Sequence, residues 1–363
     1  MGKQKNWLAG VTVAVLIILM LIAVMTKAWL ITAAIIGFMF GFAMQKGSFC
    51  GASIISSVIL YRDLKGVKAF IAVIAVSMIG FAGLAALGWI KLNPKGLELL
   101  PMALGGLIFG IGMVLGGGCI SGSLYKAGEG RLTSILALLG IGLGTNMVQA
   151  GALREFAARI AATTANIRIS NSLDQMIDVD YKIWAIIIFI FVAVILFMGR
   201  RRLDDGSNQN GLVYRVISKK WSIITSGAVI GVIAWFAYLS SAAAGRNYTL
   251  GVTGGVMAVA AFLAGVNTKF NWWLLIEVLA VMAGSAVSAK LSGDLKFRSA
   301  DPQTLIIAFS GGIIMGIGAV MADGCFIGNM TSGWALLSSG SLVAGISTIF
   351  GNWIATYYYL RGK

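Results

Sequence analysis

Three cysteines are the residues of this sequence whose type and placement could do chemistry. Cys50, Cys119 and Cys325 are the only cysteines among 363 residues, and each follows a glycine-rich apolar segment, as Gly-Ser-Phe-Cys, Gly-Gly-Gly-Cys and Asp-Gly-Cys. A short segment rich in Gly and Ser follows each thiol. A thiol is a weak hydrogen-bond donor, and it becomes a nucleophile when it ionises. We interpret each unit as a helix that breaks at a thiol, and we expect the three thiols to share one function.

The residues around the cysteines disfavour several kinds of thiol chemistry. An odd number of cysteines, none near another in the sequence, does not suggest a disulfide framework. There is no Cys-x-x-Cys motif, and the sequence lacks histidine, the commonest metal ligand, so we expect neither a metal nor a cofactor. The lack of histidine also excludes a Cys–His nucleophilic pair. Protons would have to move on carboxylates, thiols or water.

The composition indicates a membrane protein. Hydrophobic residues make up 58% of the sequence and charged residues 11%, and the mean hydropathy is +0.90. A hydrocarbon core of ~30 Å needs roughly 20 apolar residues to cross it. We predict an all-α polytopic membrane protein with about seven to nine transmembrane helices, including clear spans near 7–26, 68–90, 132–150, 182–199, 221–240, 271–290 and 340–360. The first has no convincing cleavage site and is interpreted as a retained helix.

The glycine-rich units recur four times, which predicts a two-fold pseudo-repeat. Each half of the chain has the order unit, span, unit, span, and the third unit lacks a cysteine and ends at Gly265–Lys269. We expect one integral membrane domain with broken or re-entrant helices near 37–60, 105–126, 251–270 and 311–334. Its predicted parts are a first half at 1–200, a basic cytoplasmic linker at 201–220 and a second half at 221–363.

The net charge of +15 sets membrane orientation in our interpretation, because the cations lie between apolar spans. They form no basic stripe with interleaved aromatic residues, so we expect no nucleic acid partner. Four charged residues near the cysteine units are candidates for attracting an anion or for coupling: Lys46, Lys126, Glu129 and Asp323. Lys126 could instead be a cytoplasmic anchor, and Asp323 could simply cap a helix.

A broken helix inside a bilayer indicates function, because lipid offers no partner for the freed backbone groups. Transporters use such half-helices near the membrane midplane, where helix N-termini direct partial positive charge at an anion. Two simpler interpretations stay open. Glycines at four-residue spacing, such as Gly37/Gly41 and Gly312/Gly316, often mark tight helix packing, and a lone buried cysteine is usually inert. The repeated position of all three cysteines favours the functional interpretation.

The sequence resembles the YeeE/YedE family of membrane proteins, whose better-understood members are thiosulfate transporters of bacterial inner membranes. The matching motifs are Gly-Ser-Phe-Cys at 47–50, Gly-Gly-Gly-Cys-Ile-Ser-Gly-Ser-Leu-Tyr-Lys-Ala-Gly-Glu-Gly at 116–130 and Asp-Gly-Cys-Phe-Ile-Gly-Asn-Met-Thr-Ser-Gly at 323–333. The resemblance implies an hourglass-like helical protein in which short broken helices meet at the centre. It also implies that thiosulfate passes along Cys50, Cys119 and Cys325. Some relatives are linked to selenium metabolism, but they tend to have a Cys-Pro sequence that is absent here.

We therefore predict a multi-pass inner-membrane protein that takes up thiosulfate and is not an enzyme. The substrate-binding residues are expected to be the three cysteines with their neighbours Gly47, Ser48, Gly118, Ser121, Gly324 and Asn329. The chain has no sulfurtransferase domain, so a TusA-like or rhodanese-like protein is the expected cytoplasmic acceptor of imported sulfur. Alternatives are a membrane thiol oxidoreductase, which needs two thiols within disulfide reach, and a transporter or channel for another small sulfur or selenium species.

Overall fold

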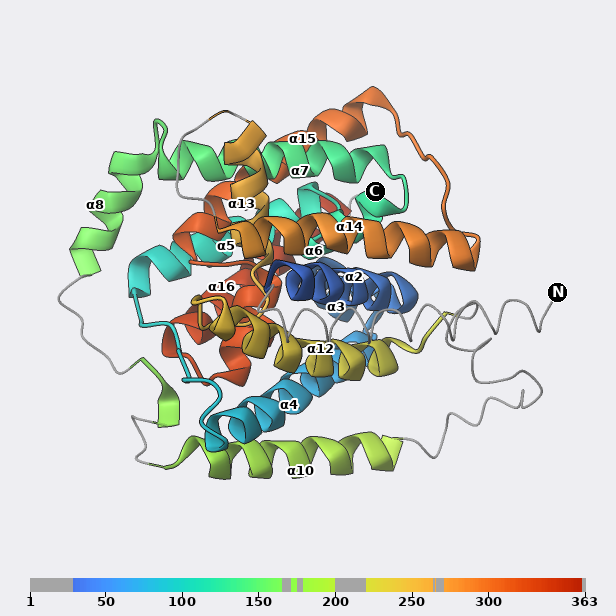
Figure 1. The fold of residues 1–363 in the computed structure, drawn as a ribbon. Helices are drawn as coiled ribbons and strands as arrows, with labels where there is room; N and C mark the ends of the chain where they lie inside the picture. The colour runs from blue at the N-terminus through green and yellow to red at the C-terminus, as the bar shows by residue number, and fades with distance from the viewer. Residues whose placement is uncertain are drawn as a thin grey trace.

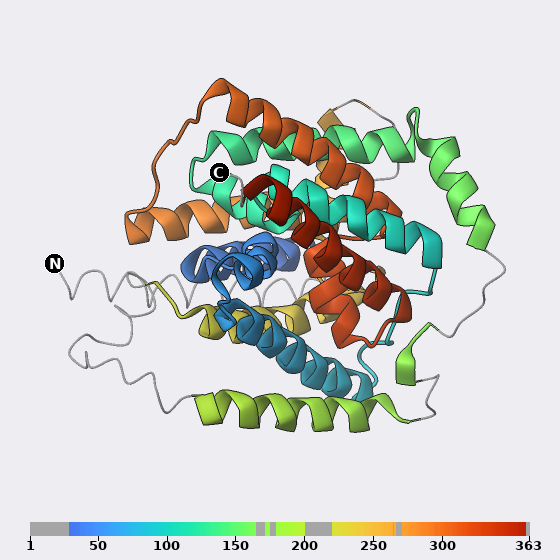
Figure 2. The same ribbon diagram turned by 180° about the vertical axis from the view of Figure 1, so that it is seen from behind.

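The computed structural model describes residues 29–164, 171–174, 179–199, 220–263, 265 and 271–360. Within these residues the chain forms helices and no β-strand, which confirms the all-α prediction (Figures 1 and 2). The helices are α2 Trp29–Gly47, α3 Gly51–Tyr61, α4 Lys65–Ala86, α5 Leu99–Leu115, α6 Ile120–Gly128, α7 Leu132–Gln149, α8 Arg154–Thr164, α10 Tyr181–Gly199, α12 Ile223–Ala243, α13 Val252–Leu263, α14 Trp272–Ser292, α15 Pro302–Met321 and α16 Ser339–Ala355. Two π-helices, η2 Phe326–Gly333 and η3 Thr356–Leu360, complete the described elements.

Seven segments of the described chain are long and apolar enough to cross a membrane, as predicted for a polytopic protein. Four of them, α4, α7, α12 and α14, coincide with predicted spans. The other three, 29–61, 99–128 and 302–321, contain helices that the sequence suggested were parts of broken units. The apolar part of α10 and the 17-residue α16 are shorter than a full span. The predicted span at 7–26, and all of the predicted linker except Lys220, lie outside the described residues.

Helices of the two halves pack on each other reciprocally. In the first half α2 packs on α14, and in the second half α12 packs on α4. In the same way α5 packs on α16, and α15 packs on α7. Two further extensive contacts, α2 with α12 and α5 with α15, join helices that occupy equivalent positions in the two halves. This is the pairing expected of two related halves that face each other.

The contacts between equivalent helices are antiparallel. Thr32, near the start of α2, bonds Ser240 near the end of α12, while the Lys46 carbonyl at the end of α2 accepts from Trp221, just before α12. α5 and α15 cross in the same sense, since a β-carbon added to Gly105 would meet Met321 at the end of α15. Halves that run in opposite directions through a membrane are an inverted repeat, the architecture of many secondary transporters.

Glycines make the close helix contacts possible. A β-carbon added to Gly37 or Gly41 of α2 would lie 2.2 or 2.0 Å from a carbonyl oxygen of α14. Added to Gly312 or Gly316 of α15, it would lie 2.2 or 2.5 Å from a carbonyl oxygen of α7. No side chain fits at such distances. The glycines at four-residue spacing therefore serve helix packing, as the simpler interpretation of these glycines in the sequence suggested.

We expect Gly351→Ala to destabilise the fold while Gly83→Ala does not. A β-carbon at Gly351 would lie 2.1 Å from the Leu107 carbonyl oxygen and force α16 away from α5. Overpacking of this kind costs roughly 1–3 kcal/mol and would lower the unfolding temperature by roughly 2–10 °C. Gly83 is exposed on α4 with no atom within 4 Å of an added β-carbon, so alanine should be neutral or stabilising there. Thermal unfolding of both variants in detergent checks this, and equal unfolding temperatures would contradict it.

Four breaks interrupt the helices, and all four have the same turn. One residue adopts a left-handed backbone, namely Ser48, Gly117, Asp323 or Gly245. The next residue donates its N–H to the carbonyl five residues earlier: Phe49 to Met44, Gly118 to Met113, Gly324 to Ala319 and Arg246 to Ser241. This is a Schellman motif, which satisfies carbonyl groups that the ended helix leaves free. Inside a membrane that satisfaction is what allows a helix to break.

The fourth break lies at 244–251, before α13. The third sequence unit was expected to end at Gly265–Lys269, and 266–269 lie outside the described residues. The reciprocal packing pairs α12, this break and α13 with α2, the Cys50 break and α3. In the first three breaks a cysteine follows the turn at once and the next helix begins one residue later. In the fourth, Asn247 follows the turn and α13 begins only after Gly251.

Candidate functional site

Cys50 and Cys119 form a buried thiol pair. Their sulfurs lie 4.0 Å apart, within hydrogen-bonding range for sulfur, although 69 residues separate them in the sequence. The two residues are 1% and 0% exposed, and neither forms a disulfide. Each is the N-cap residue of a short helix, Cys50 of α3 and Cys119 of α6. The break therefore places each thiol beside the N-terminal amides of a helix, where partial positive charge is concentrated.

Polar groups and a glycine complete the surroundings of the thiol pair. The Gly122 N–H donates to the Cys119 sulfur at 3.3 Å, and the Ser121 hydroxyl lies at 3.3 Å from the same sulfur. A β-carbon on Gly122 would lie only 2.5 Å from the Cys50 sulfur, so glycine makes room for the pair. Lys126 bonds the Gly117 carbonyl at 2.7 Å and its ammonium lies against Gly118, which brings a cation close to the thiols.

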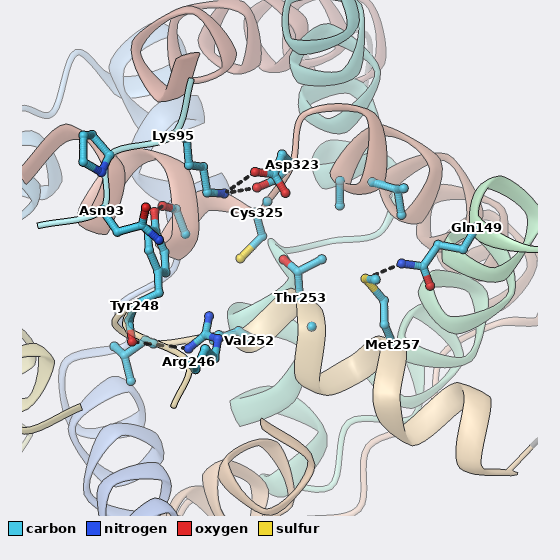
Figure 3. A pocket seen from close by; sticks show the side chains of 18 residues that line it. Asn93, Lys95, Gln149, Arg246, Tyr248, Val252, Thr253, Met257, Asp323 and Cys325 are labelled. Atoms are coloured by element: carbon cyan, nitrogen blue, oxygen red, sulfur yellow. Dashed lines mark hydrogen bonds and ion pairs between the residues drawn. The ribbon is translucent and has the colours of Figure 1, made fainter. Parts of the chain in front are cut away.

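Cys325 lines a separate cavity of about 390 Å³ (Figure 3). The cavity wall combines residues of the loop before α5, the fourth break, α13 and the third cysteine break. In Figure 3 the Cys325 sulfur points into the cavity, with Lys95 on one side and Arg246 on the other. Like the other two cysteines, Cys325 is an N-cap residue, here of η2. Short π-helical turns of this kind are frequent at functional sites.

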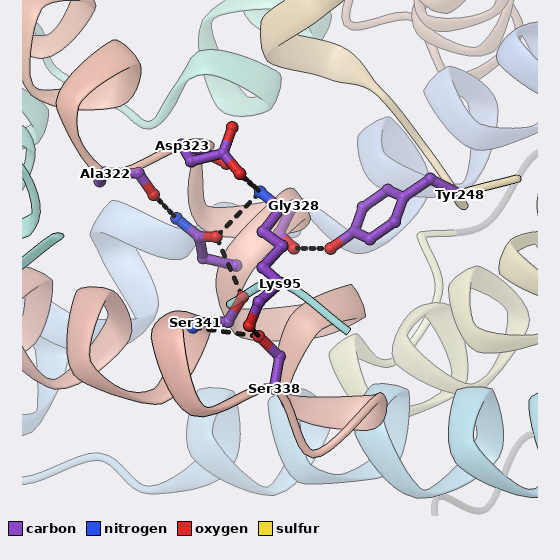
Figure 4. Close-up of polar contacts among 8 residues, drawn as sticks. Lys95, Tyr248, Ala322, Asp323, Gly328, Ser338 and Ser341 are labelled. Carbon is purple, nitrogen blue, oxygen red and sulfur yellow. Dashed lines mark hydrogen bonds and ion pairs between the residues drawn. The ribbon is translucent and has the colours of Figure 1, made fainter. Parts of the chain in front are cut away.

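Lys95 lines the cavity together with Cys325 (Figure 3), and its polar contacts are drawn in Figure 4. Its ammonium bonds the Asp323 carbonyl oxygen, the Asn329 side-chain oxygen at 3.2 Å and the Asp323 carboxylate at 3.4 Å. The Lys95 side chain is 16% exposed and that of Asp323 is 69% exposed. Burial lowers the pKa of the Lys95 ammonium, and the Asp323 carboxylate opposes that shift. A cation that is largely shielded from solvent and lies near a thiol is suited to bind an anion.

Arg246 brings a second cation to the same cavity. Its guanidinium donates to the Thr249 carbonyl at 2.5 Å and to the Ser241 hydroxyl at 3.3 Å. It also lies over the rings of Tyr248 and Trp273, with centroids at 5.5 and 5.8 Å. Burial lowers the pKa of this guanidinium, but an arginine in a protein keeps its charge. Lys95 and Arg246 together give the cavity a positive character, and Asp323 is the one acidic residue among those that line it.

A buried aromatic ring lies next to both the third cysteine and the thiol pair. Phe326 follows Cys325 directly and is 1% exposed. A β-carbon on Gly51, the residue after Cys50, would lie 2.4 Å from the Phe326 ring. Phe326 therefore connects the two sites: it follows Cys325 in the chain, and its ring packs on the residue next to Cys50.

The predicted site residues fall into three groups. The first group is the thiol pair, Cys50 and Cys119, with its neighbours Gly118, Ser121 and Lys126. The second group lies around Lys95 and consists of Cys325, Gly324, Asn329 and Asp323. Ser48 belongs to neither group, because its side chain is exposed in the turn before Cys50. The third group lies elsewhere. Lys46 bonds Ser292 at 2.5 Å, Glu129 bonds Arg131 at 3.1 Å and Gln45 at 3.3 Å, and Gly47 packs on Ser226. Sequence reasoning missed Lys95 and Arg246.

The chain is similar in sequence to a family of transport proteins. A family model described as sulphur transport matches residues 46–354. The thiosulfate transporter TsuA of Spirochaeta thermophila is 31% identical over 91% of this chain and 99% of its own length. TsuA of Escherichia coli K12 is 29% identical over 92% and 95%, and the probable transporter YedE of the same organism is 30% identical over 49% and 43%. These relatives are named as transporters, and the resemblance that the motifs suggested is confirmed. The chain belongs to the sulphur transport family.

Proposed function

We propose that this protein takes up thiosulfate across the bacterial inner membrane along a path that passes Cys325, Cys119 and Cys50. The observation that carries the proposal is the shared position of the thiols. Each is buried, each is the N-cap residue of a short helix, and each follows the same Schellman turn inside a membrane protein. Three inert cysteines would have no reason to share that geometry.

The chemistry of the site fits a small anion with a soft sulfur end. Thiosulfate is a dianion whose oxygens suit ammonium, guanidinium and helix N-terminal N–H groups. Its terminal sulfur is soft and polarisable, and a thiol S–H is a weak donor that matches it better than it matches a hard oxygen. Sulfate has the charge but not the soft end. The thiols would therefore supply selectivity, and the cations and amides would supply affinity.

The proposed path runs from the cavity in which Cys325 lies to the thiol pair. The cavity holds Cys325 and two cations, and Phe326, the residue after Cys325, packs on Gly51 beside the thiol pair. We propose that the anion first binds between Lys95 and Arg246, passes Cys325 and then meets Cys119 and Cys50 as the Phe326 ring moves. Each contact is a hydrogen bond, so no covalent bond forms and no electron is transferred. A TusA-like or rhodanese-like protein at the cytoplasmic face would receive the sulfur.

Uptake of labelled thiosulfate by vesicles that contain the purified chain tests this function. We expect saturable uptake that excess unlabelled thiosulfate abolishes and that equal sulfate reduces by less than half. Empty vesicles and vesicles with protein alkylated at its thiols are the controls. Absence of protein-dependent uptake would contradict the proposal, and equal competition by sulfate would remove the selectivity that we assign to the thiols. Selenosulfate as competitor extends the test to the related selenium anion.

A thiol oxidoreductase is the second candidate, because the 4.0 Å between the Cys50 and Cys119 sulfurs is a short distance for two buried thiols. A disulfide needs the sulfurs at about 2.05 Å, which a small adjustment of both side chains could provide. The two functions differ in the state of the thiols during turnover. Mass spectrometry of alkylated protein, taken during thiosulfate uptake, should show both thiols reduced if the protein is a transporter. Accumulation of a Cys50–Cys119 disulfide would favour the oxidoreductase.

A further inference from the structure

The fourth break holds a carboxylate near the helix start where the other three hold a thiol. The Gly251 N–H, directly before α13, donates to both carboxylate oxygens of Glu277, at 3.1 and 3.3 Å. Glu277 belongs to α14 and is 0% exposed. A helix N-terminus attracts negative charge, so the protein's own carboxylate occupies the place where an anion would otherwise bind.

Arg246 is the charged group that interacts with Glu277. The two side chains attract each other electrostatically, and Arg246 reaches the site from the break itself. The described residues of α13 contain no ionisable side chain. Other ionisable residues lie around or along α14. Tyr238 of α12 and Tyr248 of the fourth break lie near Arg246, and Tyr125 of α6 bonds Ser285 through its carbonyl. Glu129, just after α6, reaches Ser288 through Gln45, and Lys46 of α2 contacts Ser292 at the far end of α14.

Glu277 lies directly behind the wall of the cavity. Its donor Gly251 and its cationic partner Arg246 both line the cavity that Cys325 enters. An anion that binds Arg246 therefore competes with Glu277 for the same cation and the same backbone N–H. Two negative groups that share one buried cation disfavour each other. Adding a proton to Glu277 would remove this competition.

We infer that Glu277 takes up a proton when thiosulfate binds, so that the protein carries a proton together with the anion. The inference rests on the proposed function and names its coupling ion. The proton comes from water on the cavity side, bonds to a Glu277 oxygen and returns to water once the anion has left and Glu277 again accepts from Gly251. Nothing is oxidised or reduced, and the charge carried falls from −2 to −1.

The membrane potential gives this coupling a physical advantage. Moving one negative charge into a cell whose interior is electrically negative is unfavourable. A bare dianion faces twice that cost, and one accompanying proton halves it. The pH gradient across an energised membrane then adds further driving force.

Proton uptake by the wild-type chain is the first test. Purified protein in detergent with little buffer and a pH indicator dye is mixed with thiosulfate between pH 6 and pH 8. We expect the solution to become more alkaline in proportion to thiosulfate bound, with up to one proton taken up per anion. Thiosulfate binding with no proton uptake at any pH would overturn the inference and leave the proposed function intact. Failure of thiosulfate to bind at all would overturn the proposed function.

The Glu277→Gln variant identifies the proton-binding group. Glutamine keeps an acceptor for the Gly251 N–H but cannot titrate. We expect thiosulfate exchange between vesicle interior and exterior to persist within about threefold of wild type, while acidification of the lumen, reported by an enclosed dye, is lost. Glu129→Gln is the matched control, because Glu129 is also a buried acid, 7% exposed, but belongs to the Arg131 contact.

Each outcome of the comparison decides the inference. Lumen acidification that persists in Glu277→Gln, or that is lost in Glu129→Gln instead, would assign the proton elsewhere and overturn it. If Glu277→Gln fails to fold, Glu277→Asp keeps the carboxylate one methylene further from Gly251. That variant should retain proton uptake with a shifted pH dependence. An unchanged pH dependence in Glu277→Asp would contradict the role of Glu277.

Discussion

Replacing Lys95 by glutamine is expected to lower thiosulfate uptake about 10- to 100-fold at substrate concentrations below KM. A hydrogen bond to a charged group contributes about 1.5–3 kcal/mol, and each 1.4 kcal/mol is a factor of ten in binding. Lys95 is mostly buried and stands beside Cys325 in the cavity, so water replaces little of what the ammonium provides. The loss should appear mainly as a raised KM, because the ammonium binds the anion before it reaches the thiols.

The structure supplies a matched control for Lys95 in the same loop. Lys91→Gln removes an equal charge from an exposed side chain that does not line the cavity. Its effect on uptake should be less than twofold, since exposed charges are screened by salt. Similar losses in both variants would show that general surface charge, not the Lys95 contact, attracts the anion. Lys95→Arg should keep most of the uptake, because it keeps the charge.

Asp323 should oppose Lys95 in the same measurement. Its carboxylate bonds the Lys95 ammonium at 3.4 Å and is largely exposed to water. Removing it leaves the ammonium more available to an incoming anion and removes a like charge from the cavity. The sequence suggested Asp323 as a group that attracts or couples, or as a simple helix cap. The structure pairs Asp323 with Lys95, and within the function proposed above we expect thiosulfate to displace this carboxylate from the ammonium.

The sequence predicted the helix breaks at the cysteines because their signals are local. A run of small residues, a left-handed turn and a thiol lie within a few positions of each other at Gly116–Cys119 and Asp323–Cys325. Hydropathy likewise predicted most spans. It did not predict Trp29–Tyr61 or Leu99–Gly128, each of which joins the helices on both sides of a break. It also did not predict the unbroken helix Pro302–Met321, which the sequence assigned to a glycine-rich unit.

Lys95, Arg246 and Glu277 could not be predicted in the same way, because their roles depend on contacts across the fold. Lys95 lies more than 220 residues from Asp323, and nothing in the Asn-Pro-Lys-Gly sequence around it indicates a partner. The fourth break lacks the cysteine that marked the others. One signal was available: Gly245 and Arg246 follow an apolar helix just as Gly117 and Gly118 do.

The largest loss of all is expected at the thiol pair, from substitutions of Cys119 and of the glycine that makes room for it. Cys119→Ser replaces a soft donor by a hard hydroxyl. The serine oxygen is smaller, and it prefers the Ser121 hydroxyl and the Gly122 N–H that already contact this position. We expect uptake of thiosulfate to fall at least about 100-fold with the protein still folded, since the change is nearly isosteric.

Gly122→Ala tests the same pair without changing either thiol. The added methyl would lie 2.5 Å from the Cys50 sulfur and 3.2 Å from the Cys119 sulfur, so at least one sulfur must move. If transfer between the thiols requires their present contact, this variant should lose as much uptake as Cys119→Ser while Gly83→Ala retains it. The measurement is the initial rate of labelled thiosulfate uptake by the three variants at matched protein content. Normal uptake in Gly122→Ala would show that the anion does not pass between these two sulfurs, because no path through the pair could tolerate a methyl group placed there.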